Sequence, residues 1–346
     1  MPLEELKARI EEKHLVVNRI REEIGKVLVG QRDLIDGLLM GLFTRGHILI
    51  EGVPGLAKTS AVKALADTVH ADFKRIQFTP DLLPADLVGT EIYRPKTGDF
   101  SIKKGPLFNN IILADEINRA PSKVQSALLE AMQERQVTIG DTTFPLADPF
   151  LVMATQNPIE QEGTYPLPEA QLDRFMFNVV VEYPDGSDEV EILRRTTEAA
   201  PVELPAIMDG AEILELQALV RRVPIADDML SYAARLVRAT RPDSDEAPGF
   251  VKESLKWGAG PRAGQFLVLG AKTRAVIRGR FHVSMEDIQR CARPVLRHRI
   301  LTNYSAQAEG IRPDDIIDRL LDTVALHPTE AGNDGGLQQV VSSGDA

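Results

Sequence analysis

The chain has 346 residues and a net charge of −11, because its 51 Asp and Glu outnumber its 40 Lys and Arg. This length predicts one large domain and a smaller one. The negative charge argues against a general binder of the nucleic-acid backbone, which normally shows a basic face. The single cysteine, Cys291, excludes an internal disulfide framework. No apolar run approaches the roughly 18 residues of a membrane helix, and the charged N-terminus is unlike a secretory signal, so we expect a cytoplasmic protein without a membrane segment.

The first 45 residues predict two helices. Apolar residues recur at steps of three and four from Leu3 to Ile24, which is the pattern of an amphipathic helix. A second helix is expected through Leu34, Leu38 and Leu42. Two heptad-like turns do not make a coiled coil, so we expect the first helix to pack on the main domain.

The next segment has the layout of a phosphate-binding loop. The apolar run over residues 48–50 predicts a buried strand, glycines follow at positions 52 and 55, and a helix pattern continues after Lys58 and Thr59. Backbone N–H groups of such a loop, together with the helix start, cradle the phosphates of a nucleoside triphosphate. Lys58 would place its charge on the β- and γ-phosphates, and Thr59 would ligate Mg²⁺. The alternative is an ordinary tight turn between a strand and a helix.

Ala57 departs from the usual loop, in which a glycine precedes the lysine. If this position has a positive φ, the methyl group costs roughly 1–2 kcal/mol, whereas a negative φ makes the cost small.

Two hairpins interrupt the middle of the chain. Alternating segments flank Pro95–Gly98, and a second pair of short strands flanks Gly140-Asp141. They are either surface decorations or contact sites. We favour contact, because segments inserted into a binding core often carry function.

Between the hairpins, the apolar run over residues 111–114 ends in Asp115 and Glu116. A buried strand beside the phosphate loop would place Asp115 near Mg²⁺ and Glu116 near the γ-phosphate, where Glu116 would orient and deprotonate the attacking water. An earlier strand is expected over residues 73–78. A later one, over residues 150–155, leads to Asn157, whose amide would bond the same water or the γ-phosphate. The alternative for Asn157 is an Asn-Pro turn.

A helix over residues 169–174 runs into a strand over residues 175–181. Arg174 is either a surface residue paired to Asp173 or a charge delivered to a neighbour's phosphate. Helices then dominate, at residues 213–220, 228–238, 265–278 and 286–296, and predict a small helical domain. Pro261 suits a first helical turn, so Arg262 would face whatever lies across the cleft.

Two further stretches of the C-terminal half stand out by composition. Eight Lys or Arg between residues 272 and 299 face only Glu286 and Asp287, and we expect a solvated helical face or a subunit contact there. From about residue 330 the chain is rich in Gly and polar residues, which predicts disorder.

Taken together, these motifs resemble those of AAA+ ATPases, and of the MoxR family in particular, over roughly residues 10–325. The similar segments are Gly52–Thr59, in which alanine at position 57 is itself usual for the family, Ala114–Ala120, Leu129–Gln136, Ala154–Pro158 and Pro168–Phe175. The resemblance implies an α/β fold, with a P-loop AAA+ core, a five-stranded parallel sheet, helices on both of its faces and two β-hairpin inserts, followed by a small all-α lid. The expected domains are N-terminal helices (1–45), the nucleotide-binding core (46–185), the lid (186–329) and a disordered tail (330–346). Gly260 differs from the family's usual serine, at a cost of only about a few tenths of a kcal/mol.

By position, the resemblance implies a role for each site residue. Lys58 and Thr59 match the Walker A motif and Asp115 and Glu116 the Walker B motif, while Asn157 matches sensor 1, Arg174 the arginine finger and Arg262 sensor 2. We therefore expect catalysis from Glu116, Asn157, Arg174 and Arg262, and metal binding by Thr59 and Asp115. The expected nucleotide-binding residues are Gly30, Gly52, Val53, Pro54, Gly55, Leu56, Ala57, Lys58, Thr59 and Ser60.

The implied activity is Mg²⁺-dependent ATP hydrolysis by a homo-oligomeric ring, commonly a hexamer. Such rings act like chaperones on partner proteins, often ones with von Willebrand factor A domains or metal cofactors. Two related functions stay open: the ATPase subunit of a magnesium chelatase, which would need large partner subunits encoded nearby, and a DNA-handling motor of the same clade. Such a motor would need basic residues at its hairpin tips to bind DNA, and this chain has only Lys96, Lys103 and Lys104 there, beside Glu91 and Asp99. We therefore expect no nucleic-acid partner.

Overall fold

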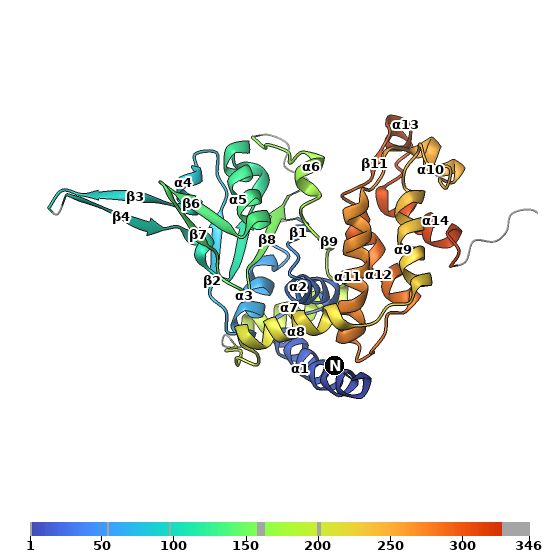
Figure 1. The fold of residues 1–346 in the computed structure, drawn as a ribbon, viewed down its shortest axis with the longest axis horizontal. Coiled ribbons are helices and arrows are strands. Elements are labelled where there is room, and N and C mark those ends of the chain that lie inside the picture. Colours follow the sequence, from blue (N-terminus) through green and yellow to red (C-terminus); the bar gives the residue numbers. More distant parts are fainter. Residues whose placement is uncertain (1, 54, 97, 158–162, 199–201, 327–346) are drawn as a thin grey trace, which may run out of the picture.

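A parallel sheet of five strands, in the order β2-β5-β8-β1-β9, forms the centre of the nucleotide-binding part (Figure 1). The computed structural model describes residues 2–53, 55–96, 98–157, 163–198 and 202–326. The strands of the sheet are β1 (Ile48–Glu51), β2 (Phe73–Gln77), β5 (Ile111–Asp115), β8 (Leu151–Gln156) and β9 (Phe177–Val180). Because every pair is parallel, all five strands end at the same edge of the sheet, where the segments after β1, β5 and β8 gather. The predicted five-stranded parallel sheet is confirmed.

Helices cover both faces of this sheet, as predicted. Successive side chains of a strand point to opposite faces, so Ile48 and Ile50 of β1 belong to one apolar cluster and Leu49 belongs to another. The first cluster includes residues of α1 (Leu3–Val27), α2 (Arg32–Thr44) and α3 (Lys58–Thr68), and the second includes residues of α4 (Pro84–Val88) and α5 (Ser122–Glu134). The first cluster continues into the helices of the C-terminal half, so the two halves of the chain share one apolar interior.

Both predicted hairpins are present. The first pairs β3 (Gly89–Arg94) with β4 (Asp99–Lys104), and the second pairs β6 (Gln136–Ile139) with β7 (Thr142–Pro145). The β3–β4 hairpin projects far from the body of the molecule (Figure 1). Its Tyr93 and Phe100 are 53% and 67% exposed and pack against each other with ring centroids 5.3 Å apart. By contrast, Val137 and Ile139 of the second hairpin are buried.

The C-terminal half is mainly helical, and the four helices predicted there are confirmed. The core also contains two short 3₁₀ turns, at Pro106–Phe108 and Ile117–Arg119, and helix α6 (Glu169–Leu172). The elements of the C-terminal half are α7 (Gly186–Glu198), α8 (Gly210–Arg222), α9 (Asp227–Ala239), α10 (Gly249–Ser254), β10 (Leu255–Trp257), α11 (Pro261–Ile277), α12 (Met285–Leu296), β11 (Leu301–Thr302), α13 (Tyr304–Ala308) and α14 (Pro313–Thr323). The antiparallel pair of β10 and β11 was not predicted, because strands of three and two residues are too short to show an alternating pattern.

Helix α8 lies against α2, where the side-chain amide of Gln217 donates a hydrogen bond to the carbonyl of Leu42 at 2.7 Å. The domain limits at residues 45, 185 and 329 stay predictions, and the tail at 330–346 lies outside the described residues. Among the residues that the structure describes, no helix combines the length and apolar character needed to span a membrane.

The basic segment from residue 272 to 299 is not simply a solvated face, which corrects one expectation. Five of its arginines form ion pairs with acidic residues that are mostly distant in sequence: Arg274 and Arg280 with Asp287, Arg293 with Asp318, Arg297 with Asp314, and Arg299 with Asp173. The Asp287 side chain is fully buried and that of Arg299 is 2% exposed. Much of this positive charge is therefore internal to the fold.

Candidate functional site

The phosphate loop connects the end of β1 to the start of α3. Gly55 and Ala57 both have positive φ, +87° and +54°, so the backbone takes two left-handed residues before the helix starts at Lys58. The question posed by Ala57 is thereby answered: its methyl group carries the strain of roughly 1–2 kcal/mol. No side chain caps the N-terminus of α3. Uncapped N–H groups and the helix dipole at this point favour a bound anion.

Glycine is required at position 52 by a close approach of the backbone. A Cβ added there would lie 2.8 Å from the carbonyl oxygen of Val181, at the end of β9. A cavity of about 490 Å³ opens beside this contact and is lined by Glu51, Gly52, Val53, Val180, Val181, Glu182 and Tyr183. The cavity adjoins the phosphate loop, and its lining is largely apolar, as small-molecule sites usually are.

The Lys58 ammonium lies within this loop and donates a hydrogen bond to the carbonyl of Gly52 at 2.5 Å. Burial lowers the pKa of Lys58, and the charges of Asp115 and Glu116 oppose that shift. The three groups are thus close enough to interact electrostatically, although Lys58 starts α3 and the two carboxylates lie at the end of β5. Within the described residues, the Thr59 hydroxyl makes no hydrogen bond to the protein.

Asp115 and Glu116 lie at the end of β5, but β8 lies between β5 and β1. Both strands nevertheless end at the same edge of the sheet, so the carboxylates lie on the side of the phosphate loop, as the sequence predicts. Asp115 Oδ1 accepts a hydrogen bond from the Thr155 hydroxyl at 2.6 Å. Its Oδ2 accepts two from the Arg75 guanidinium, at 2.9 and 2.5 Å. Asp115 therefore already binds a cationic group.

Glu116 has a left-handed backbone, with φ +56°, and its N–H donates to the Thr155 hydroxyl at 2.8 Å. Its carboxylate accepts a hydrogen bond from the Gln77 side-chain amide at 2.8 Å and contacts Arg119 at 3.4 Å. Gln77 in turn accepts from Arg75 at 3.0 Å. The end of β2 thus contacts both carboxylates at the end of β5.

Sequence reasoning missed Arg75, Gln77 and Thr155. The available signal for the first two was their spacing of two residues, which places Arg75 and Gln77 on the same face of a strand of this sheet. Asn157, which was predicted, follows β8 directly and is 6% exposed. Because β8 pairs with both β1 and β5, Asn157 lies at the edge of the sheet between the loop and the carboxylates.

The other expected nucleotide-binding residues are placed as follows. Leu56 is half-buried against the first apolar cluster, Ser60 is exposed in the first turn of α3, and Pro54 lies outside the described residues. Gly30, with φ +74°, packs against Asp188 of α7, since a Cβ there would collide with that carboxylate. Its role in nucleotide binding stays a prediction.

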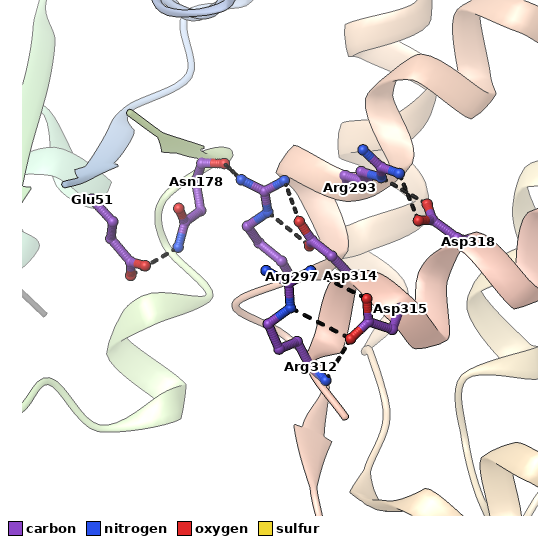
Figure 2. Close-up of polar contacts among 8 residues, drawn as sticks. All are labelled: Glu51, Asn178, Arg293, Arg297, Arg312, Asp314, Asp315 and Asp318. Atoms are coloured by element: carbon purple, nitrogen blue, oxygen red, sulfur yellow. Dashed lines mark hydrogen bonds and ion pairs between the residues drawn. The ribbon is translucent and has the colours of Figure 1, made fainter. Parts of the chain in front are cut away.

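A polar chain connects the loop's strand to the helical half (Figure 2). Glu51 accepts a hydrogen bond from the Asn178 side chain at 3.0 Å, and the Asn178 carbonyl has a long contact, 3.5 Å, with Arg297. Arg297 forms two hydrogen bonds to Asp314 at 3.0 and 2.8 Å. Burial raises the pKa of Glu51. The end of β1 is therefore linked through β9 to α12 and α14.

Arg174 and Arg262 lie away from the phosphate loop. Strand β9 pairs in parallel with β1, with Phe177 opposite Ile48, so the residues before β9 lie at the edge where β1 begins. The loop follows the other end of β1, and the strand between them spans roughly 10 Å. Arg262 donates a hydrogen bond to Asp173 at 3.0 Å, which brings it to the turn that carries Arg174.

The Arg174 side chain lines a cavity of about 300 Å³ together with Ser126, Leu129, Glu130, Gln133, Glu134 and Gln171. Asp173 pairs with Arg262 and Arg299 and not with Arg174, which contradicts the alternative that Arg174 is paired to Asp173. Among the described residues, the Arg174 guanidinium has no hydrogen bond or ion pair. It is available to a group from outside the chain.

Comparison with known proteins agrees with this arrangement. Residues 47–177 match the ATPase family associated with various cellular activities (AAA), and residues 250–320 match the AAA lid domain. The protein named Chaperone MoxR1 of Mycobacterium tuberculosis is 47% identical over 309 residues, which cover 89% of this chain and 82% of that protein. YeaC of Bacillus subtilis is 43% identical, over 91% of this chain and 96% of its own length.

Two further similarities extend the comparison. The protein named MoxR of Methylorubrum extorquens is 29% identical over 88% of this chain and 94% of that protein. A crystal structure of a Cytophaga hutchinsonii protein assigned as an ATPase matches with a TM-score of 0.86 and 49% identity, over 93% of this chain and 97% of that one. The fold is thus that of a P-loop AAA+ core followed by a helical lid, and the chain belongs to the MoxR family of AAA+ ATPases.

Proposed function

We propose that the chain hydrolyses ATP in a homo-oligomeric ring and that a neighbouring subunit completes each active site. The phosphate loop and Lys58 bind the triphosphate, Glu116 deprotonates the attacking water, and Asn157 orients that water or the γ-phosphate. The apolar cavity beside Gly52 and Tyr183 receives the nucleoside. Arg174 comes from the next subunit.

The observation that carries this proposal is the separation of the catalytic groups. The loop, Asp115 and Glu116 lie at the edge where the parallel strands end, whereas Arg174 precedes β9 at the opposite edge and has no partner among the described residues. An arginine in that position serves a phosphate on another subunit more readily than the phosphate of its own loop. A cation at the γ-phosphate offsets the negative charge of the transition state, an effect of about 10³–10⁵-fold where arginine fingers have been measured.

The residues at the end of β5 fit a divalent cation. Asp115 already accepts a positive group, the guanidinium of Arg75, and that arginine side chain is half exposed and can move aside. The Thr59 hydroxyl has no competing hydrogen bond within the described part of the chain. Mg²⁺ at Thr59 and Asp115 would neutralise phosphate charge.

We further propose that the ring, commonly a hexamer in this family, remodels partner proteins, including ones with a von Willebrand factor A domain. Two observations support a protein partner. A relative with 47% identity carries the name chaperone, and the projecting β3–β4 hairpin exposes Tyr93 and Phe100, which are residue types enriched in protein interfaces.

The dependence of activity on protein concentration tests the proposal. Turnover per subunit should rise as rings assemble, and Arg174→Ala should bind ATP but hydrolyse it slowly at every concentration. Lys58→Ala should instead weaken ATP binding. Constant turnover per subunit across assembly, together with normal turnover in Arg174→Ala, would refute it.

A further inference from the structure

The turn between α6 and β9, residues 173–176, is held by side chains from the lid. Arg299, just past the end of α12, donates to the Asp173 carboxylate at 2.8 Å and to the carbonyls of Asp173, Phe175 and Met176 at 2.9, 2.6 and 3.3 Å. His298 also contacts the Phe175 carbonyl, at 3.0 Å. One guanidinium thus binds three of the four backbone carbonyls of the turn that carries Arg174, using the fixed fork geometry of its five donors.

Arg299 itself is tightly enclosed. Its side chain is 2% exposed, a further hydrogen bond ties it to the Val295 carbonyl in the last turn of α12, and its guanidinium lies 4.9 Å from the centroid of the Phe266 ring. Burial lowers the pKa of Arg299 to about 10, opposed mainly by the charge of Asp173, so the group stays charged at neutral pH. A buried cation needs such a partner, and Asp173 is the acidic residue that supplies it.

Asp173 has a second cationic partner on its other oxygen. Its Oδ1 accepts from Arg299, while its Oδ2 accepts from Arg262 at 3.0 Å, at the start of α11. The Asp173 carboxylate therefore connects the backbone of the Arg174 turn, the end of α12 and the start of α11. The backbone that carries Arg174 and the side chain of Arg262 are in this way tied to one carboxylate, although the two arginines are 88 residues apart in the chain.

We propose that Asp173 and Arg299 are positioning residues that hold Arg174 and Arg262 together and direct both toward the phosphates of the neighbouring subunit. The pair transmits the orientation of the lid to the arginines, since it joins two lid helices to the turn before β9. This inference rests on the proposed function, in which Arg174 acts on the next subunit.

The test is Asp173→Asn, which keeps the shape of the side chain and one oxygen acceptor but removes the charge. Misplacing a catalytic group by about 1 Å costs up to roughly 10²-fold, so we expect turnover to fall by about 10- to 100-fold with ATP affinity unchanged. Asp173→Glu should recover much of the activity, because it restores the charge. The control is Asp318→Asn, which likewise removes the charge of an arginine-paired aspartate, in a half-exposed pair with Arg293 inside the lid and away from the Arg174 turn (Figure 2).

Complementation separates positioning from a general structural effect. An Asp173→Asn subunit keeps its own phosphate loop, and a Lys58→Ala subunit keeps an intact Asp173 and Arg174. Mixed rings should therefore regain activity that neither variant has alone, as mixtures of Arg174→Ala with Lys58→Ala should. If Asp173→Asn fails to fold, Arg299→Lys tests the same contacts, because lysine keeps the charge but cannot reach several carbonyls at once.

The outcomes distinguish this inference from the proposed function. Full turnover in Arg174→Ala would defeat both. Slow turnover in Arg174→Ala with wild-type turnover in Asp173→Asn and Arg299→Lys would overturn the positioning role alone. The positioning role would also be overturned if Asp173→Asn loses turnover and Lys58→Ala subunits rescue Arg174→Ala but not Asp173→Asn. Asp173 would then act on the active site of its own subunit.

Discussion

Replacing Glu116 by glutamine removes the carboxylate that we propose activates the water and leaves its structural contacts largely intact. The glutamine oxygen can still accept the hydrogen bond that Gln77 donates at 2.8 Å, and the backbone bond to Thr155 is untouched. The contact with Arg119 is a long, partly exposed pair at 3.4 Å, which contributes little. The left-handed backbone conformation at position 116 has to be adopted by glutamate and by glutamine alike, so any strain there is the same in both proteins. We therefore expect the free energy of unfolding to change by no more than about 0.5 kcal/mol.

The effect on catalysis should be much larger. Lys58, Thr59 and Asp115 remain in place, so ATP affinity should stay near that of the wild type. Loss of the base should lower turnover by about 10²–10⁴-fold, which corresponds to about 2.7–5.4 kcal/mol of transition-state stabilisation.

Phosphate release and binding of a fluorescent ATP analogue, measured on the same preparation, check this prediction. Glu253→Gln is the control, because it removes an exposed carboxylate in the lid away from the site. Wild-type turnover in Glu116→Gln would remove Glu116 from the mechanism. A loss of ATP affinity as large as the loss of turnover would show that Glu116 acts in binding.

Three other predictions concern the loop, the pH response and the hairpin. Ala57→Gly should raise the free energy of unfolding by up to about 1 kcal/mol in denaturant titrations, because it relieves the strain at φ +54°. The control Ala61→Gly, inside α3, should lower the free energy of unfolding. A lower free energy of unfolding in both variants would contradict the strain argument. Burial lowers the pKa of His47 to about 3, and that of His298 well below its usual value. On acidification the unfolded chain therefore protonates these histidines at a higher pH than the folded chain does. Their contribution to the free energy of unfolding should be complete above pH 6.5 and should fall below it by about 1.4 kcal/mol per pH unit for each histidine. If His47→Gln leaves this slope unchanged, the result would count against the prediction. Shortening the hairpin across Pro95–Gly98 should leave ATP binding intact and alter partner capture or ring assembly, and wild-type behaviour in both would make the hairpin decorative.

The parts of the site that could be predicted from the sequence are those encoded locally. Strand, loop and helix from Ile48 to Thr59 are contiguous, so their residue types and spacing indicate the geometry without knowledge of the rest. The same holds for the apolar run that ends in Asp115 and Glu116. The hairpins were recognisable because a turn signature separates two alternating segments.

Contacts between strands and between domains could not be read in this way. Arg75 meets Asp115 only because β2 and β5 are neighbours in the sheet, and no local pattern gives strand order. For the same reason, the position of β8 between β1 and β5 was not anticipated. Arg262 reaches Asp173 across 89 residues of sequence, so its place beside Arg174 depends on how the lid packs on the core.

Mixing Arg174→Ala with Lys58→Ala subunits tests the central claim, a site shared between two subunits, most directly. In a mixed ring, a Lys58→Ala subunit lends its Arg174 to the intact phosphate loop of its neighbour. ATP hydrolysis in the mixture should then exceed that of either variant alone, measured at the same total protein concentration. Full-rate hydrolysis by an isolated wild-type monomer, abolished in that monomer by its own Arg174→Ala substitution, would contradict the claim.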